Sequence, residues 1–282
     1  MKFNKTTTKQ DQLLDFLCAN IDIDKKLLKN QIERGECKVD DKKCLRNILL
    51  PMGSKVSIFI PNLFLEKSKN HNGIDIDNCI KYRDQNILIV DKPQGIEIQE
   101  LKNLLQPKFN DIMLTHRLDR NTAGLVLLAM GKTNQDLVID AMNNGQIKKY
   151  YYAKVYGKLQ GTQTISVYLF KDTKKSTVYI SNTKKNGYKS AITQYTALNY
   201  NTQENSTQIF IELITGRTHQ IRATMAHLGH FVLGDGKYGI GTINKNFDYK
   251  YQQLKAVKLV FAGLQGKLDY LNNTVIEVES LP

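Results

Sequence analysis

Residues 114–124 read LTHRLDRNTAG, and the apolar run LVLLAM follows directly at residues 125–130. The run contains no charged side chain and predicts a buried strand. The stretch before it places one carboxylate, Asp119, between the guanidinium groups of Arg117 and Arg120. Nearby positive charge favours the ionised form of a carboxylate. The sequence therefore predicts a charged loop at the edge of the core, whose aspartate could act as nucleophile or base on a polyanion.

The size and charge of the chain narrow the kinds of partner. Its 282 residues are enough for one large or two modest domains, and 41% hydrophobic residues predict a substantial core. Lysine and arginine number 40 against 27 aspartate and glutamate, a formal net charge of +13. This excess favours a polyanionic partner, most simply nucleic acid. A lysine-rich proteome would produce the same balance, so charge alone leaves both explanations open.

The cysteines and the apolar segments predict a cytoplasmic protein. The four cysteines lack a close paired spacing, which favours reduced thiols over disulfides or a zinc site. Residues 1–10 are polar, and no apolar stretch is long enough to span a membrane. A cytoplasmic location without a membrane partner is the expectation.

Residues 1–61 read as a small separate unit. Two helices and two short strands are expected, at residues 13–17, 27–32, 37–40 and 56–60. Gly35 is a plausible end for the second helix. Residues 62–78 are polar and lack periodicity, which predicts a linker before a larger domain at 79–282.

The remaining chain is rich in strand patterns. Nine runs predict strands, at residues 87–90, 125–130, 151–156, 164–170, 178–181, 191–200, 208–214, 255–261 and 275–279. Helical periodicity is found at residues 134–142 and 219–228. Many strands, few helices and hairpin-length connections predict an α+β fold with a mixed, mostly antiparallel sheet.

Three more strings combine turn, aromatic and basic residues. They are KPQG at residues 92–95, KYYYAKVYG at residues 149–157 and TGRTHQIR at residues 215–222. Together with HRLDRNTAG, these strings resemble the signatures of the RluA/RluD-type RNA pseudouridine synthases. They also follow one another along the sequence in the order that those signatures have. The resemblance covers roughly residues 80–280.

The resemblance implies a reaction and an architecture. The family isomerises uridine to pseudouridine in structured RNA, and for this chain we expect large-subunit ribosomal RNA. The bond from ring nitrogen to sugar breaks, the base turns, and a carbon–carbon bond forms, with no nucleotide, metal or redox cofactor. A central cleft in the larger domain is implied. Residues 1–61 resemble an S-four-type RNA-binding domain, although its usual VNGK turn reads VDDK at residues 39–42.

The resemblance also implies roles for particular residues. Asp119 would be the catalytic nucleophile, Tyr151 the ring that stacks on the target base, and Arg217 the basic partner of the carboxylate. The target base must leave its stack, and Arg117 would fill the gap, with phosphate contact as the alternative. Further substrate-binding residues are expected at His116, Arg120, Leu213, His219 and Arg222.

Two other clusters of side chains have open interpretations. His219, His227 and His230 do not have a standard metal-ligand spacing, so no metal site is expected. Six lysines lie on a predicted hairpin, at positions 171, 174, 175, 184, 185 and 189. They could follow an RNA backbone or form a solvated rim.

Rival functions remain at this point. A catalytically inactive RNA-binding or ribosome-assembly protein would have no chemical need for Asp119, Tyr151 and Arg217 together. A nuclease usually needs several carboxylates for metal ions, whereas the core motif holds one. A synthase that acts on transfer RNA is a further alternative. A monomer is expected.

Overall fold

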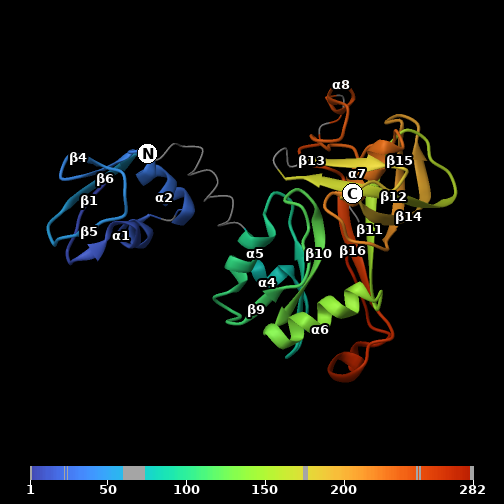
Figure 1. Cartoon of the computed structure of the whole chain (residues 1–282), viewed down its shortest axis with the longest axis horizontal. Helices are drawn as coiled ribbons and strands as arrows, with labels where there is room; N and C mark the ends of the chain where they lie inside the picture. Colours follow the sequence, from blue (N-terminus) through green and yellow to red (C-terminus); the bar gives the residue numbers. More distant parts are fainter. Residues whose placement is uncertain are drawn as a thin grey trace. The chain divides into compact units, whose positions relative to one another are not determined.

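The computed structural model describes residues 2–21, 23, 25–59, 74–173, 177–245, 247 and 249–279 (Figure 1). The chain divides into two compact units, Met1–Asp75 and Ile76–Pro282. The predicted linker at 62–78 lies outside the described residues as far as residue 73. Its last three residues belong to helix α4 (Ile76–Cys79) of the larger unit. The domain boundaries at residues 61 and 79 stay predictions.

The smaller unit combines two helices with short antiparallel strands. Its elements are β1 (Lys2–Thr6), β2 (Asp11–Gln12), α1 (Leu13–Asn20), α2 (Lys25–Glu33), β3 (Cys37–Val39), β4 (Lys42–Cys44), β5 (Leu49–Leu50) and β6 (Lys55–Phe59). Four of the strands form a sheet in the order β1-β6-β3-β4. Both predicted helices and both predicted strands are present. Strand β1 was not expected, because its sequence KFNKT is polar and only Phe3 packs against the core.

The larger unit is built on one sheet that has eleven strands among the described residues, in the order β13-β12-β14-β15-β11-β16-β10-β8-β7, with β17 beside β16 and β9 beside β10. The strands are β7 (Ile80–Arg83), β8 (Ile87–Lys92), β9 (Ile112–Leu114), β10 (Ala123–Met130), β11 (Ile147–Tyr156), β12 (Thr162–Asp172), β13 (Thr177–Ser181), β14 (Lys189–Asn201), β15 (Ser206–Leu213), β16 (Leu254–Phe261) and β17 (Val275–Glu277). The helices are α4, α5 (Ile98–Leu105), α6 (Lys132–Asn143), α7 (Gln220–His227), α8 (Gly241–Asn244) and the 3-10 helix η1 (Gly266–Leu271). Only the pairing of β10 with β16 is parallel among those described. The predicted α+β class with a mostly antiparallel sheet is confirmed.

Strand β10 lies in the core, as its apolar run predicts. Residues 125–129 are almost fully buried. Leu125, Leu127 and Ala129 pack in one cluster with Val138 and Ala141 of α6, which lies along this part of the sheet (Figure 1). A strand buried on both faces has no reason to alternate apolar and polar residues. The charged loop before β10 is thereby attached to a strand that is buried in the core of the unit.

The predicted lysine-bearing hairpin is also present, since β12 pairs antiparallel with β13. Lys174 and Lys175 lie outside the described residues. Lys184, Lys185 and Lys189 are exposed, and Lys185 lies over the ring of Tyr188. A role in RNA binding stays a prediction.

Gly124 allows β10 and β16 to meet. It pairs with Ala256 in the parallel register and has a φ of +110°, a conformation that side chains rarely adopt. A Cβ at this position would overlap the backbone carbonyl of Ala256. Because the obstacle is backbone in a buried strand, it cannot move aside easily.

We therefore expect Gly124→Ala to destabilise the larger unit by about 3 kcal/mol, through backbone strain and overpacking. Gly145→Ala is the matched control. Gly145 also has a positive φ, of +72°, but its Cβ would meet open space, so the cost should be about 1 kcal/mol. Urea midpoints would measure both. Equal losses in the two variants would show that the contact with Ala256 is not the constraint.

Candidate active site

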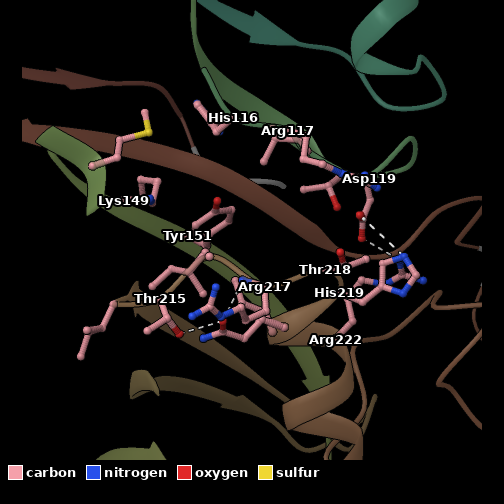
Figure 2. A pocket seen from close by; sticks show the side chains of 18 of the residues that line it. His116, Arg117, Asp119, Lys149, Tyr151, Thr215, Arg217, Thr218, His219 and Arg222 are labelled. Atoms are coloured by element: carbon pink, nitrogen blue, oxygen red, sulfur yellow. Dashed lines mark hydrogen bonds and ion pairs between the residues drawn. The ribbon is translucent and has the colours of Figure 1, made fainter. Parts of the chain in front are cut away.

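A pocket of about 400 Å³ lies in the larger unit, where four segments meet (Figure 2). These are the loop at residues 115–122, the second half of α6, the first half of β11, and residues 213–222, which lead from β15 into α7. Leu254, at the start of β16, completes the lining. Of the nine predicted site residues, eight line the pocket: His116, Arg117, Asp119, Tyr151, Leu213, Arg217, His219 and Arg222. Arg120 does not. Segments far apart in sequence thus come together as the motifs predicted.

The loop that carries Asp119 is tied to β10. The hydroxyl of Thr115 donates to the carbonyl of Leu127 (2.6 Å), and the amide of Leu127 donates to Nε2 of His116 (2.9 Å). Burial, with a smaller effect of the Lys149 charge, lowers the pKa of His116 to about 3, so the ring is neutral and keeps its proton on Nδ1. His116 therefore fixes the backbone before Asp119.

The KPQG turn holds the other side of this loop. Lys92 is fully buried, and its ammonium donates to the carbonyls of Pro93 (3.0 Å), Ile96 (2.9 Å) and Arg120 (3.1 Å). Burial lowers the pKa of Lys92 to about 8, which leaves it mostly charged at neutral pH. One buried cation thus fastens the turn to the residue after Asp119.

Arg120 helps to hold the loop against the turn and does not line the pocket, and its predicted role in substrate binding stays a prediction. Its Nε donates to the carbonyl of Gly95 (2.9 Å), whose amide donates back to the Arg120 carbonyl (3.0 Å). Its guanidinium also lies 3.7 Å from the carboxylate of Glu97. The side chain is drawn toward the KPQG turn and away from Asp119.

Asp119 makes its ion pair with Arg222. Nη1 of Arg222 donates to Oδ2 of Asp119 (2.7 Å), while Nε and Nη2 bind both oxygens of Asp235 (2.7 and 2.9 Å). Asp235 is fully buried and also accepts the amides of Lys237 and Tyr238. Burial alone would lower the pKa of Arg222, but the two carboxylates raise it above its usual value. The guanidinium is therefore a permanent cation between two acids.

This geometry corrects the predicted partner of the carboxylate, which was Arg217. Arg217 is exposed, and its Nε donates to the carbonyl of Ser190 (3.1 Å). The side chain lines the pocket, but within the described part of the chain no hydrogen bond or ion pair joins it to Asp119. The two arginines belong to the same string and are five residues apart, so the motif alone did not distinguish them.

His219 approaches Asp119 from a strained backbone position. Its φ is +52°, and it directly precedes α7. Nδ1 lies 2.8 Å from the hydroxyl of Tyr238, which itself accepts the amide of Val178 (3.0 Å). The tyrosine proton is thus available for Nδ1, which leaves the ring proton on Nε2, 3.7 Å from Oδ1 of Asp119. Burial lowers the pKa of His219 despite the opposing charge of Asp119, so the ring is neutral at pH 7.

Tyr151 forms the floor of the pocket. It is 5% exposed, and burial, followed by the charge of Asp119, raises the pKa of its phenol. Tyr150 and Tyr152 contact Phe210 instead, at ring distances of 5.4 and 5.1 Å. Alternation along β11 therefore directs only the middle tyrosine toward Asp119.

Two predicted residues lie at the margin of the pocket. Arg117 is exposed, and no hydrogen bond or ion pair holds it within the described part of the chain. Leu213 ends β15 and supplies an apolar wall. The pocket thus has an apolar side and a cationic rim.

Sequence reasoning gave no role to three residues that shape the site, Asp235, Tyr238 and Lys149. Asp235 follows the apolar segment FVLG and so had a weak signal as a buried acid. The sequence around Tyr238 carried no such signal, because the contacts of this residue depend on tertiary structure. Lys149 stands at the start of the KYYYAKVYG string, and it lines the pocket.

Within the described residues, no group of three or more His, Cys, Asp or Glu side chains could hold a metal ion. The three histidines that are close in the sequence have different partners. His219 bonds to Tyr238, His227 to Asn182, and His230 to the carbonyl of Tyr156. No helix in the described ranges is long and apolar enough to cross a membrane.

Comparisons with known proteins identify the family of the chain. The model of the RNA pseudouridylate synthase family matches residues 86–227. An uncharacterized RNA pseudouridine synthase of Mycoplasma capricolum is 30% identical, over 93% of this chain and 89% of that protein. Ribosomal large subunit pseudouridine synthase C of Buchnera aphidicola is 30% identical, over 77% of this chain and 72% of that protein.

A solved structure shows the same fold. Human RNA pseudouridylate synthase domain containing 1 superposes with a TM-score of 0.59 at 24% identity, over 72% of this chain and 82% of that one. The family match covers half of the chain, and the Mycoplasma relative extends the similarity over nearly all of it. The chain therefore belongs to the RNA pseudouridylate synthase family and is an isomerase that acts on RNA.

Proposed function

We propose that the chain converts specific uridines of large-subunit ribosomal RNA to pseudouridine, with Asp119 as the nucleophile. The observation that carries the proposal is the position of this carboxylate. Among the described residues that line the pocket, Asp119 is the one acid, the others being basic, polar or apolar, and it lies beside Tyr151. The name of the Buchnera relative supports the ribosomal target, and the net charge of +13 supports an RNA partner.

The ion pair leaves Asp119 with one oxygen available for chemistry. Arg222 binds Oδ2, whereas the partner of Oδ1 among the described residues is the more distant His219, at 3.7 Å. A fixed carboxylate with one occupied oxygen can attack through the other. The target is either the anomeric carbon of the uridine or its pyrimidine ring.

The reaction balances without a co-reactant. The bond from N1 to the sugar C1′ breaks, the base turns, and C5 bonds to C1′. The proton lost from C5 is matched by the one that N1 gains, so no atom is added and nothing is oxidised.

Tyr151 and Arg117 suit the handling of the base. The buried phenol stays protonated, and its ring offers an apolar face on which an extruded uracil can stack. Arg117 has no fixed partner in the described residues, so it is available to enter the stack that the base leaves.

The smaller unit would hold RNA as an S-four-type domain. This assignment, a cytoplasmic location and a monomeric state are predictions from the sequence. A synthase specific for transfer RNA, or an RNA-binding protein without turnover, are the rival functions that the following experiments separate.

Asp119→Asn should abolish pseudouridine formation on transcribed large-subunit ribosomal RNA, because an amide is not a nucleophile at neutral pH. RNA binding and the unfolding temperature should stay near those of the original protein. Asp136→Asn, which breaks only an exposed ion pair with Lys132, is the control. The assay is pseudouridine mapping with EDTA present. Residual turnover above about one part in a thousand would exclude Asp119 as the nucleophile.

Arg222→Lys should lower single-turnover rates about 100-fold or more, because lysine cannot bind Asp235 with two parallel bonds and also reach Asp119. The unfolding temperature should fall, since Asp235 is left buried with a poorer partner. Arg217→Lys should change the rate by about threefold at most and weaken RNA binding modestly. If Arg217→Lys instead causes the larger loss of rate, the assignment of the carboxylate's partner is wrong.

Arg117→Ala should slow turnover far more on a target flanked by duplex than on a short unstructured RNA, if its side chain replaces the flipped base. A phosphate contact would instead give similar losses on both RNAs, largely recovered at low salt. Turnover of the two RNAs at two salt concentrations decides between these roles. Equal losses that vanish at low salt would leave Arg117 as a backbone anchor.

A further inference from the structure

Lys149 has a cationic side chain in the pocket, and none of the described carboxylates forms an ion pair with it. Its neighbour Lys148 is exposed and pairs with Glu212 (3.6 Å). For Lys149, no hydrogen bond or ion pair is present within the described ranges, and the single carboxylate of the pocket already belongs to Arg222. Lys149 is thus a candidate contact for something that enters the pocket.

The charge of Lys149 is in an unfavourable environment while the pocket is empty. Burial lowers the pKa of its ammonium, and no neighbouring acid offsets this effect. An unpaired charge that has lost part of its water gains more than an exposed one from a hydrogen-bond acceptor. The side chain is therefore suited to a ligand that brings partial or full negative charge.

The position of Lys149 relative to Tyr151 and Asp119 indicates which part of a substrate it meets. Lys149 and Tyr151 are two residues apart on β11, so their side chains share one face of the strand, with Cα atoms separated by roughly 7 Å. Figure 2 shows Lys149 on one side of the Tyr151 ring and Asp119 on the other. A base that stacks on Tyr151 with its sugar at Asp119 would direct its far edge toward Lys149.

The far edge of uracil carries a carbonyl before and after the reaction. In uridine the sugar is on N1, and the atom across the ring is C4, which bears O4. In pseudouridine the sugar is on C5, and the atom across the ring is C2, which bears O2. A single fixed donor at this end can therefore bond to substrate and product alike.

The same donor would act on the charge that develops during the reaction. When the bond from N1 to C1′ breaks, its electron pair stays with the base. The negative charge is shared between N1 and the carbonyl oxygens O2 and O4. A cation at the far edge lies beside one of these oxygens, where fixed charges stabilise developing charge most effectively.

We propose that Lys149 is a catalytic residue that donates a hydrogen bond to the far carbonyl of the flipped uracil and stabilises the negative charge of the detached base. The inference rests on the proposed function of the same pocket. Lys149 keeps its own proton, so the exchange of a C5 proton for an N1 proton stays balanced. No oxidant, metal or further reactant is required.

Lys149→Met tests the proposal, because it removes the charge and keeps most of the side-chain length. The single-turnover rate at saturating RNA should fall about 100-fold, the usual loss for one transition-state donor. The salt dependence of RNA affinity should be unchanged, because Lys149 would contact the base and no phosphate. Lys148→Met is the matched control and should retain the full rate. The unfolding temperature of Lys149→Met should equal or exceed that of the original protein, because an unpaired, partly buried charge is removed.

A second measurement uses the substrate and does not depend on how well the variant folds. RNA with 4-thiouridine at the target presents sulfur, a weaker acceptor, in place of O4. The original protein should turn this RNA over more slowly than the normal one, whereas Lys149→Met should hardly distinguish the two. Lys149→Arg, which keeps the charge, should recover part of the rate.

Three results would overturn the proposal. An unchanged rate with weaker binding, and a salt slope smaller by about 0.9, would make Lys149 a phosphate contact. A large fall in unfolding temperature with a normal rate would make it structural. Equal sensitivity of both proteins to 4-thiouridine would exclude the carbonyl contact. In each case the original protein still forms pseudouridine, whereas its inactivity on every RNA would refute the proposed function itself.

Discussion

The pocket depends on the ion-pair chain from Asp235 through Arg222 to Asp119. Asp235 is fully buried and anchored by two backbone amides, and Arg222 projects from α7 between the two carboxylates. These ion pairs connect the loop before β10 to helix α7, because Arg222 lies 103 residues after Asp119 in the sequence. Nη1 of Arg222 is 2.7 Å from Oδ2 of Asp119. Buried ion pairs contribute little net stability because desolvation offsets the attraction. The role of these ion pairs is better explained by position, because they fix one carboxylate oxygen of Asp119.

The sheet order explains why four distant motifs meet. Strands β15, β11, β16 and β10 are consecutive in the sheet. The loop of Asp119 precedes β10, Tyr151 lies on β11, and the TGRTHQIR string follows β15. The KPQG turn extends from β8, the other neighbour of β10, so Lys92 can reach the carbonyl of Arg120. Each motif therefore lies at the end or on the face of one of these neighbouring strands. The parallel pairing at Gly124 allows β10 to lie next to β16 in the sheet.

Much of this arrangement could be predicted from the sequence, because it depends on local pattern. The run at 125–130 and the eight other strand runs were found from their apolar patterns. The family strings located seven of the eight predicted residues that line the pocket, and Leu213 was predicted from its place on the strand before the last string. What could not be predicted depends on tertiary contact. Arg217 and Arg222 look equivalent in the string, but the left-handed turn at His219 separates them. Arg222 therefore lies buried on α7, whereas Arg217 is an exposed residue of the pocket lining. Arg120 likewise turns to Gly95, and β1 is a strand only because β6 pairs with it.

The most direct test of the central claim is a pseudouridine map of total RNA from cells that contain this protein and from cells that lack it. The proposed function predicts that one or a few uridines of large-subunit ribosomal RNA are pseudouridine only when the protein is present. Losses confined to transfer RNA would keep the isomerase chemistry and contradict the ribosomal target. Identical maps in the two kinds of cell would contradict the account as a whole.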